Sequence, residues 1–181
     1  MSGYQHLAVR TSHERVVAAV AAGVAGLPPG GGAHVGPTDD RWCGVVPYAG
    51  PAPGADVRAG VVAAVLSDNL GVPVLWARVG PGGLDVRLFV FGAEIVSYRS
   101  PEVPGPAAGL AAVGVVERLI DATDAPALPG DLARVLVADY PDPQERYRHL
   151  VEVLGLPGYL VGAGAGDEAP PGFVAVPAGA G

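Results

Sequence analysis

Apolar and polar residues alternate most clearly between positions 72 and 100, where the chain reads as three antiparallel strands joined by two turns. In the middle strand, over 84–91, Asp85 and Arg87 point to one side, and the apolar residues point to the other: Leu84, Val86, Leu88 and Val90. The first strand, 74–79, ends in a Gly-Pro-Gly-Gly turn. Gly92-Ala93 is the predicted loop into the third strand, 94–99, because glycine reaches the positive φ that hairpin loops need. The pattern predicts a half-buried antiparallel sheet.

Two strand–helix units are predicted before this meander. A strand over 5–10 leads into a helix over 12–25, for which Thr11 and Glu14 have the spacing of a capping box. The stretch 27–40 contains prolines and a glycine triplet, so we predict an irregular loop there, followed by a strand over 41–48. A second helix, 56–70, is expected to start at Asp56 and to end at Gly71.

Helices dominate the prediction after the meander. One is expected over 107–122, and 132–137 fits either a short helix or a strand. Asp142, Pro143 and Glu145 form the clearest helix start in the chain, and this helix should run to Leu154. Residues 163–181, rich in Gly, Ala and Pro, are expected to form a flexible tail.

The predicted architecture is therefore a single α+β domain over 1–162. It has a mainly antiparallel sheet of about five strands, with the three-stranded meander as its C-terminal part. Two N-terminal helices and a helical C-terminal region are expected to pack against this sheet.

Composition excludes several kinds of chemistry. The 181 residues carry a net charge of -7, and all 11 basic residues are arginine, so no Schiff-base lysine or Walker-type phosphate loop is possible. The acidic balance disfavours nucleic-acid binding, and no apolar run approaches the roughly 20 residues that span a bilayer. A single cysteine, Cys43, and an N-terminus without a secretory signal favour a cytoplasmic location. We predict no cofactor.

The meander also carries the candidate binding residues. Arg78, Arg87 and Arg99 decorate it among acidic side chains, and guanidinium groups bind carboxylates and phosphates through two parallel hydrogen bonds. Trp76 and Tyr98 on neighbouring strands are expected to add aromatic surface. Cross-strand ion pairing explains the same charges without any ligand.

A second cluster suggests metal or thiol chemistry. His34, Asp39, Asp40 and Cys43 lie within ten residues and include ligand types that hold divalent ions. Cys43 could alternatively pair with a histidine as a nucleophile. The plainer interpretation is a solvated loop with a buried, inert thiol, because structural metal sites use more closely spaced ligands.

Three segments resemble a loose family of small uncharacterised bacterial proteins. They are LFVFGAEIVSYRSPE (88–102), RHLVEVLGLPGYLVGAGAG (148–166) and VVAAVLSDNLGVPVL (61–75). Tyr98, Ser100 and Pro101 match that family's Tyr-x-Ser-x-Pro pattern only approximately. The resemblance implies an α+β fold and no particular activity.

The opening HLAVRTS (6–12) is similar to the first strand of vicinal-oxygen-chelate, or glyoxalase-like, proteins. In that family a strand histidine binds metal, so the resemblance implies a ligand role for His6. The family also needs a second histidine or glutamine and a glutamate on paired strands. Glu94, the only glutamate in the meander, lies at a predicted turn.

Three functions fit the sequence. The preferred one is a non-enzymatic binding protein, such as an immunity-like or regulatory domain whose partner is another protein; its acidic balance would steer it toward a basic surface. The alternative is a small-molecule or metal-dependent enzyme centred on His6, His34, Asp39, Asp40 and Cys43. A third is a structural subunit with an exposed apolar sheet face. A homo-oligomer is compatible with each.

Overall fold

The computed structural model describes residues 4–49, 57–100, 106–125, 128–163 and 169–179. In these residues the chain forms strands and helices in the order β-α-β-β-α-β-β-β-α-α-α, followed by a short 3-10 helix and a last strand. The strands are β1 (Tyr4–Val9), β2 (Gly32–Asp39), β3 (Trp42–Tyr48), β4 (Val74–Gly80), β5 (Gly83–Val90), β6 (Ala93–Arg99) and β7 (Val174–Pro177). The helices are α1 (His13–Ala21), α2 (Ala59–Leu70), α3 (Pro106–Thr123), α4 (Pro129–Val137), α5 (Pro143–Leu154) and the 3-10 helix η1 (Gly158–Leu160).

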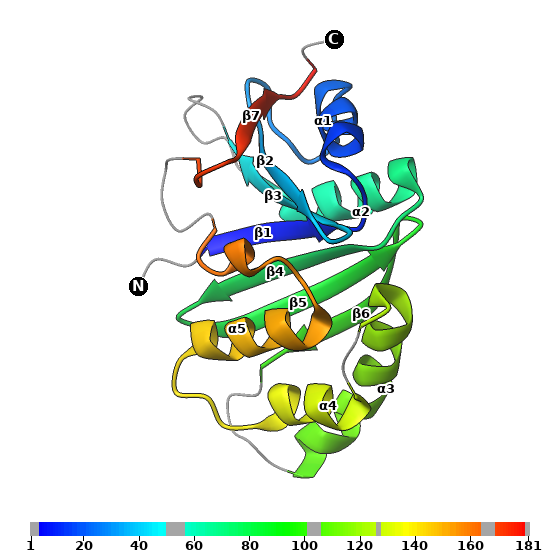
Figure 1. Ribbon diagram of the computed structural model, residues 1–181, viewed down its shortest axis with the longest axis vertical. Coiled ribbons are helices and arrows are strands. Elements are labelled where there is room, and N and C mark those ends of the chain that lie inside the picture. The colour runs from blue at the N-terminus through cyan, green and yellow to red at the C-terminus, as the bar shows by residue number, and fades with distance from the viewer. Residues whose placement is uncertain (1–3, 50–56, 101–105, 126–127, 164–168, 180–181) are drawn as a thin grey trace.

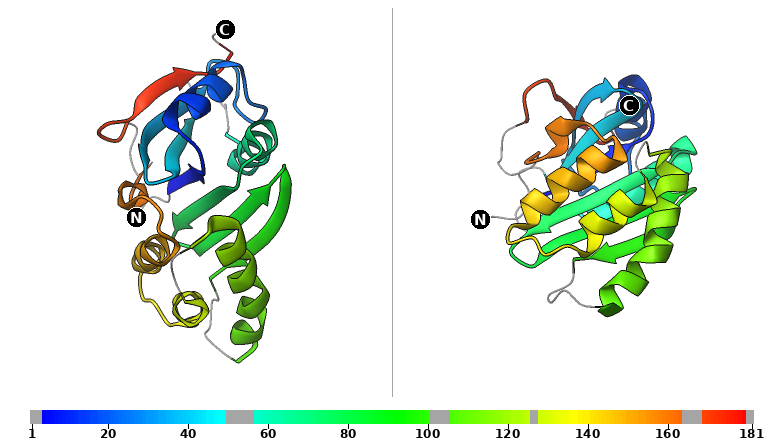
Figure 2. Two further views of the ribbon diagram at one scale, coloured as in Figure 1. Left: turned by 45° about the vertical axis from the view of Figure 1, so that its right-hand side comes forward. Right: turned by 60° about the horizontal axis from the view of Figure 1, so that its bottom comes forward.

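All described strands join one sheet in the order β6-β5-β4-β1-β3-β2-β7, and every neighbouring pair is antiparallel. Helices α1 and α2 pack on one face of this sheet, and α3, α4 and α5 pack on the other (Figure 1). The turned views in Figure 2 show the same layering. The α+β fold class is confirmed, although the sheet is larger than the expected five strands.

Strand alternation separates two hydrophobic clusters across the sheet. Leu75 and Val86 belong to the cluster under α3, α4 and α5, whereas Val74 and Trp76 belong to the cluster under α1 and α2. Because successive side chains of a strand point to opposite faces, both faces of β4 are buried near its start. Helix α2 lies against β1, β4 and β5, and α1 lies against β2 and β7.

The meander is confirmed nearly as predicted. Its second hairpin loop is Phe91-Gly92 rather than Gly92-Ala93, with φ values of 49° and 77°. Two consecutive positive φ values are typical of the type I′ turn that suits a twisted hairpin. The predicted start and end of α5 are also confirmed. At its N-cap, Asp142 accepts a hydrogen bond from the Gln144 backbone N–H (2.9 Å), and at its C-cap, Gly155 has a left-handed backbone.

The predicted loop over 27–40 is wrong, because β2 occupies most of it. Glycines that suggested a loop allow close packing instead: a Cβ on Gly32 would overlap the Val176 carbonyl oxygen of β7, and one on Gly36 would lie 2.8 Å from the Phe173 ring. Strand β7 itself lies within the predicted flexible tail, whose residues 174–177 pair with β2.

Other helix boundaries differ from expectation. The capping box of α1 is absent, since Ser12 is the N-cap, and the His13 backbone N–H donates to Thr38 Oγ1 instead (2.7 Å). The segment 132–137 is helical, as part of α4. Asp56, the expected cap of α2, lies outside the described residues. None of the helices in the described part of the chain is long and apolar enough to cross a membrane.

Candidate binding surface

Charged side chains form a row across β4, β5 and β6. Arg78 pairs with Asp85, which pairs with Arg99, and the next row along the strands contains Trp76, Arg87 and Ser97. Trp76 is buried under α2, so alternation places all of these side chains on the α2 side of the sheet. We call Trp76, Arg78, Asp85, Arg87 and Arg99 the arginine face.

Asp85 is the centre of the arginine face. Its side chain is only 7% exposed, and Oδ2 lies 3.3 Å from Arg99 Nη2 and 3.7 Å from Arg78 Nη2, while Oδ1 lies 3.7 Å from Arg87 Nε. Of these contacts, the one from Arg99 is a hydrogen bond. A carboxylate removed from water needs opposite charge around it, and three guanidinium groups supply this charge.

The arginines carry more charge than their acidic neighbours neutralise. Arg87 has a second contact with Glu94 (3.4 Å), so among the described residues the three guanidinium groups share two carboxylates. The Arg78 and Arg99 side chains are 56% and 66% exposed. Since each guanidinium has five N–H donors and Asp85 engages few of them, the outer donors face solvent. These N–H groups can donate hydrogen bonds to a further carboxylate or phosphate.

An aromatic residue supports one of these arginines. The Arg87 guanidinium carbon lies 5.0 Å from the centre of the Trp76 ring, a cation–π distance. Trp76 Nε1 is buried and has no hydrogen-bond partner among the described residues. The stacked ring holds Arg87 in place beside Asp85.

Tyr98, the fifth predicted binding residue, does not share this surface. It follows the opposite parity to Arg99 along β6, so it lies under the C-terminal helices. Its hydroxyl donates to the Leu136 carbonyl (2.6 Å) and accepts from Arg146 Nη1 (2.7 Å). Burial raises the pKa of Tyr98. The alternation of β6 already places Tyr98 and Arg99 on opposite faces, and this signal in the sequence corrects the prediction.

Arg146 is a buried charge that the sequence does not reveal. The helix around it reads as a solvated face, yet the side chain is 4% exposed and donates to the carbonyls of Leu136 and Ala138 (both 2.6 Å) and to Tyr98. Tyr140 lies against its guanidinium. Arg146 therefore ties α5 to the end of α4 and to β6.

The residues of the predicted metal cluster are not brought together. His34 and Cys43 lie on opposite faces of the sheet, because Cys43 packs with Val45 while His34 pairs with Val46. Asp39 and Asp40 are exposed at the end of the β2–β3 hairpin. Within the described residues, no group of three or more His, Cys, Asp or Glu side chains could hold a metal ion.

Cys43 is placed as a structural thiol. It is fully buried, and its Sγ donates to the Gly36 carbonyl (3.1 Å) where the β2–β3 register shifts. His13 Nδ1 is hydrogen-bonded to the same carbonyl (2.7 Å). Burial raises the pKa of the Cys43 thiol to about 12, so the nucleophilic thiolate is disfavoured.

His6, the histidine suggested by the glyoxalase-like resemblance, is wholly buried under α5. Its Nε2 lies 2.5 Å from the Tyr147 hydroxyl, with which it shares a hydrogen bond. Burial lowers the pKa of His6 to about 4, so the imidazole is neutral near pH 7. Its described neighbours include Tyr4, whose ring stacks on it.

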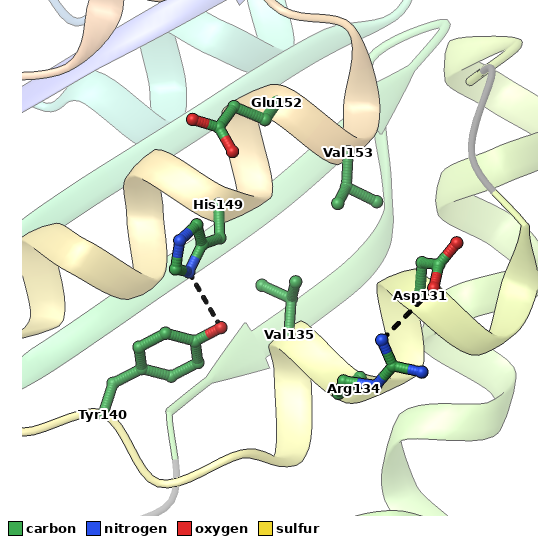
Figure 3. Close-up of a pocket in the computed structure, with 7 residues that line it drawn as sticks. All are labelled: Asp131, Arg134, Val135, Tyr140, His149, Glu152 and Val153. Carbon is green, nitrogen blue, oxygen red and sulfur yellow. Dashed lines mark hydrogen bonds and ion pairs between the residues drawn. The ribbon is translucent and has the colours of Figure 1, made fainter.

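A groove of about 460 Å³ lies between α4 and α5 (Figure 3). His149 Nδ1 is hydrogen-bonded to the Tyr140 hydroxyl (3.0 Å), and Arg134 pairs with Asp131 (3.5 Å). Glu152 and two valines complete the lining. Acidic, basic and apolar groups are mixed there, and the arrangement favours no particular ligand charge.

Comparison of the chain with protein-family models, with curated proteins and with solved structures gave no match.

Proposed function

We propose that this chain is a non-enzymatic binding protein whose arginine face binds an acidic segment of a partner protein. The observation that carries this proposal is the cross-strand row of Arg78, Asp85 and Arg99. Its buried carboxylate fixes the guanidinium groups, while their outer donors stay exposed. In a regulatory or immunity-like role, the partner would present carboxylates at this face, instead of the basic surface that the net charge of -7 alone favours.

The charges of the arginine face favour a role in ligand binding over a role in stabilising the fold. Arg78 and Arg99 keep more than half of their side-chain surface in solvent, so their pairs with Asp85 stabilise the fold less than fully enclosed pairs would. Burying Asp85 has a desolvation cost that an apolar residue would avoid. The desolvation cost of Asp85 is offset if the arginines that it fixes also bind a ligand.

The alternatives have less support. An enzyme built on His34, Asp39, Asp40 and Cys43 needs those side chains in one pocket, and they lie apart. A structural subunit needs a broad apolar face. The exposed large apolar side chains of the described residues come from four separate segments: Val61, Phe91, Leu128 and Val174.

The proposal is tested with a flexible acidic peptide, acetylated and amidated Gly-Glu-Gly-Glu-Gly-Glu-Gly, titrated into isotopically labelled protein. NMR signals of the arginine Nε–H groups report where it binds. Work near 0.15 M salt limits the general repulsion by the net charge of -7, because the Debye length is then about 8 Å.

We expect saturable shifts at Arg78 and Arg99. Replacing both, in an Arg78→Gln/Arg99→Gln variant, should weaken binding by about tenfold or more, since charge-assisted hydrogen bonds are lost. Arg134→Gln/Arg148→Gln is the control of equal charge, because Arg134 and Arg148 are exposed arginines of α4 and α5 on the other side of the sheet. The proposal is refuted if the control loses as much affinity for the peptide as Arg78→Gln/Arg99→Gln does. It is also refuted if the peptide does not bind the wild type.

A further inference from the structure

Strand β6 is the edge of the sheet next to the arginine face. Among the described strands only β5 pairs with it, and Figure 1 shows it as the outermost strand on that side. An edge strand presents unpaired backbone N–H and C=O groups, to which another extended segment can add. The position of β6 beside Arg99 raises the question of whether the acidic partner binds as a strand.

The hydrogen bonds of β6 show which backbone groups face outward. The Ser100 N–H donates to the Leu84 carbonyl of β5 (2.8 Å), so the backbone of Ser100 faces β5. In an antiparallel pair this direction alternates along the strand. Ser97 and Arg99 therefore direct their N–H and C=O groups away from β5.

In the described part of the chain, the outward backbone groups of β6 are free only on one side of Ile95. Arg118 of α3 donates through Nη1 to the Ile95 carbonyl (2.9 Å), so this outward acceptor is already used. Ile95 is also skipped in the pairing between Leu88–Val96 and Phe89–Glu94. Such bulges and capping side chains protect an edge against indiscriminate pairing. In the described residues, the stretch left for a partner is 97–99.

Side-chain register then specifies the charge of an added strand. The row across the arginine face reads Arg78, Asp85, Arg99, that is positive, negative, positive. A residue paired with Arg99 on an added strand would be its direct neighbour, at about 4.5–5.5 Å between Cβ atoms. An acidic residue continues the alternation, whereas a basic residue would face like charge.

From this geometry we infer that the acidic partner binds by strand addition to β6, as an antiparallel eighth strand whose acidic residue pairs with Arg99. The inference rests on the proposed function and adds the form of the partner. A second copy of the chain fits less well, because pairing two β6 edges would bring two arginine faces together. The alternating charge row is the reason to choose an acidic extended segment.

The experiment compares two peptides of equal charge. One is the flexible Gly-Glu peptide above, and the other is acetylated and amidated Val-Glu-Val-Glu-Val-Glu-Val, which favours an extended strand. We expect the valine peptide to bind at least about fivefold more tightly, because a strand-propensity difference of about 1 kcal/mol at a single Gly/Val position already corresponds to that ratio. Amide hydrogen exchange at Ser97 and Arg99 should slow in its complex, because their N–H groups become hydrogen-bonded.

Substitution at Ser97 separates backbone pairing from charge. Ser97→Pro removes the outward N–H and should weaken binding of the valine peptide by about tenfold or more. Ser97→Ala keeps that N–H and should bind as the wild type does. Thermal unfolding of both variants checks that the sheet is intact. If Ser97→Pro does not fold, the amide exchange of Ser97 and Arg99 in the wild type decides the question.

Each outcome has a distinct meaning. If the arginine signals shift but Ser97→Pro binds normally and the two amides exchange as before, strand addition is wrong and the proposed function stands. If neither peptide shifts the arginine signals, both are wrong. If sedimentation shows a dimer that Ser97→Pro dissociates, the occupant of the edge is a second copy, and the acidic strand is overturned.

Discussion

His6 should make the protein lose stability as the pH falls from 7 toward 4. Its imidazole is wholly buried, and burial lowers its pKa from 6.5 to about 4. In the unfolded chain the same group has its ordinary pKa, so between pH 6.5 and 4 the unfolded state binds a proton that the folded state does not. Acid in this range therefore favours unfolding. The contribution is fully present above pH 6.5 and is lost as the pH falls.

The size of the loss follows from the two pKa values. Linkage gives a decrease in unfolding free energy of about 2 kcal/mol between pH 8 and pH 5, and about 3 kcal/mol by pH 4, from His6 alone. Carboxylates titrate over part of the same range. The informative quantity is therefore the difference between the wild type and a His6→Gln variant, which has no titrating group there.

Urea unfolding at several pH values measures this difference. We expect the wild type to lose about 2 kcal/mol more than His6→Gln between pH 8 and pH 5. Tyr147→Phe removes the hydrogen bond to His6 but leaves the ring buried, so it should lower stability by about 1 kcal/mol at every pH and keep the wild-type slope. A wild-type and His6→Gln difference that stays constant from pH 8 to pH 5 would refute the assignment.

Three further outcomes follow from the packing and the arginine face. Asp85→Asn removes the carboxylate that fixes the guanidinium groups, so the Gly-Glu peptide should bind it less tightly than the wild type in the NMR titration; equal or tighter binding would contradict the positioning role of Asp85. Gly32→Ala places a Cβ against the Val176 carbonyl and should cost about 1–3 kcal/mol, with faster amide exchange in β7 but not in β6. Arg146→Ala should cost about 3 kcal/mol in urea unfolding by leaving buried carbonyls without a donor, and Arg146→Lys should recover only part of it, because one ammonium cannot reproduce the planar array of donors; full recovery by lysine would contradict this account.

The parts of the fold that were predictable are those with strong local signals. The meander follows from strict alternation, and α5 follows from Asp142, Pro143 and a left-handed Gly155. Strands β2 and β7 were not predictable because their composition is that of a loop. Gly32 is needed where β2 approaches β7 and Tyr48 closely, so the same residue that weakens the local strand signal permits the tertiary contact.

The candidate site was predictable in part for a similar reason. Arg78, Arg87 and Arg99 stand out as charges on an alternating sheet, and their clustering on one face follows from register. The burial of His6, Asp85 and Arg146 was not predictable, since charged or ionisable residues normally indicate exposure. Each becomes buried through partners far away in the sequence, such as Tyr147 for His6.

Under the proposed function, the overall charge would make the arginine face more selective. A chain with a net charge of -7 repels acidic partners at long range, so it cannot attract them by general steering. The attraction starts only when an acidic group comes within about a Debye length, 8–10 Å, of Arg78 and Arg99. Bidentate hydrogen bonding then adds a requirement for geometry, and the edge of β6 adds a requirement for extended backbone. A diffuse acidic surface meets neither requirement, whereas a single acidic strand meets both. Short-range attraction and the need for an extended backbone together explain how an acidic protein could bind an acidic strand at β6.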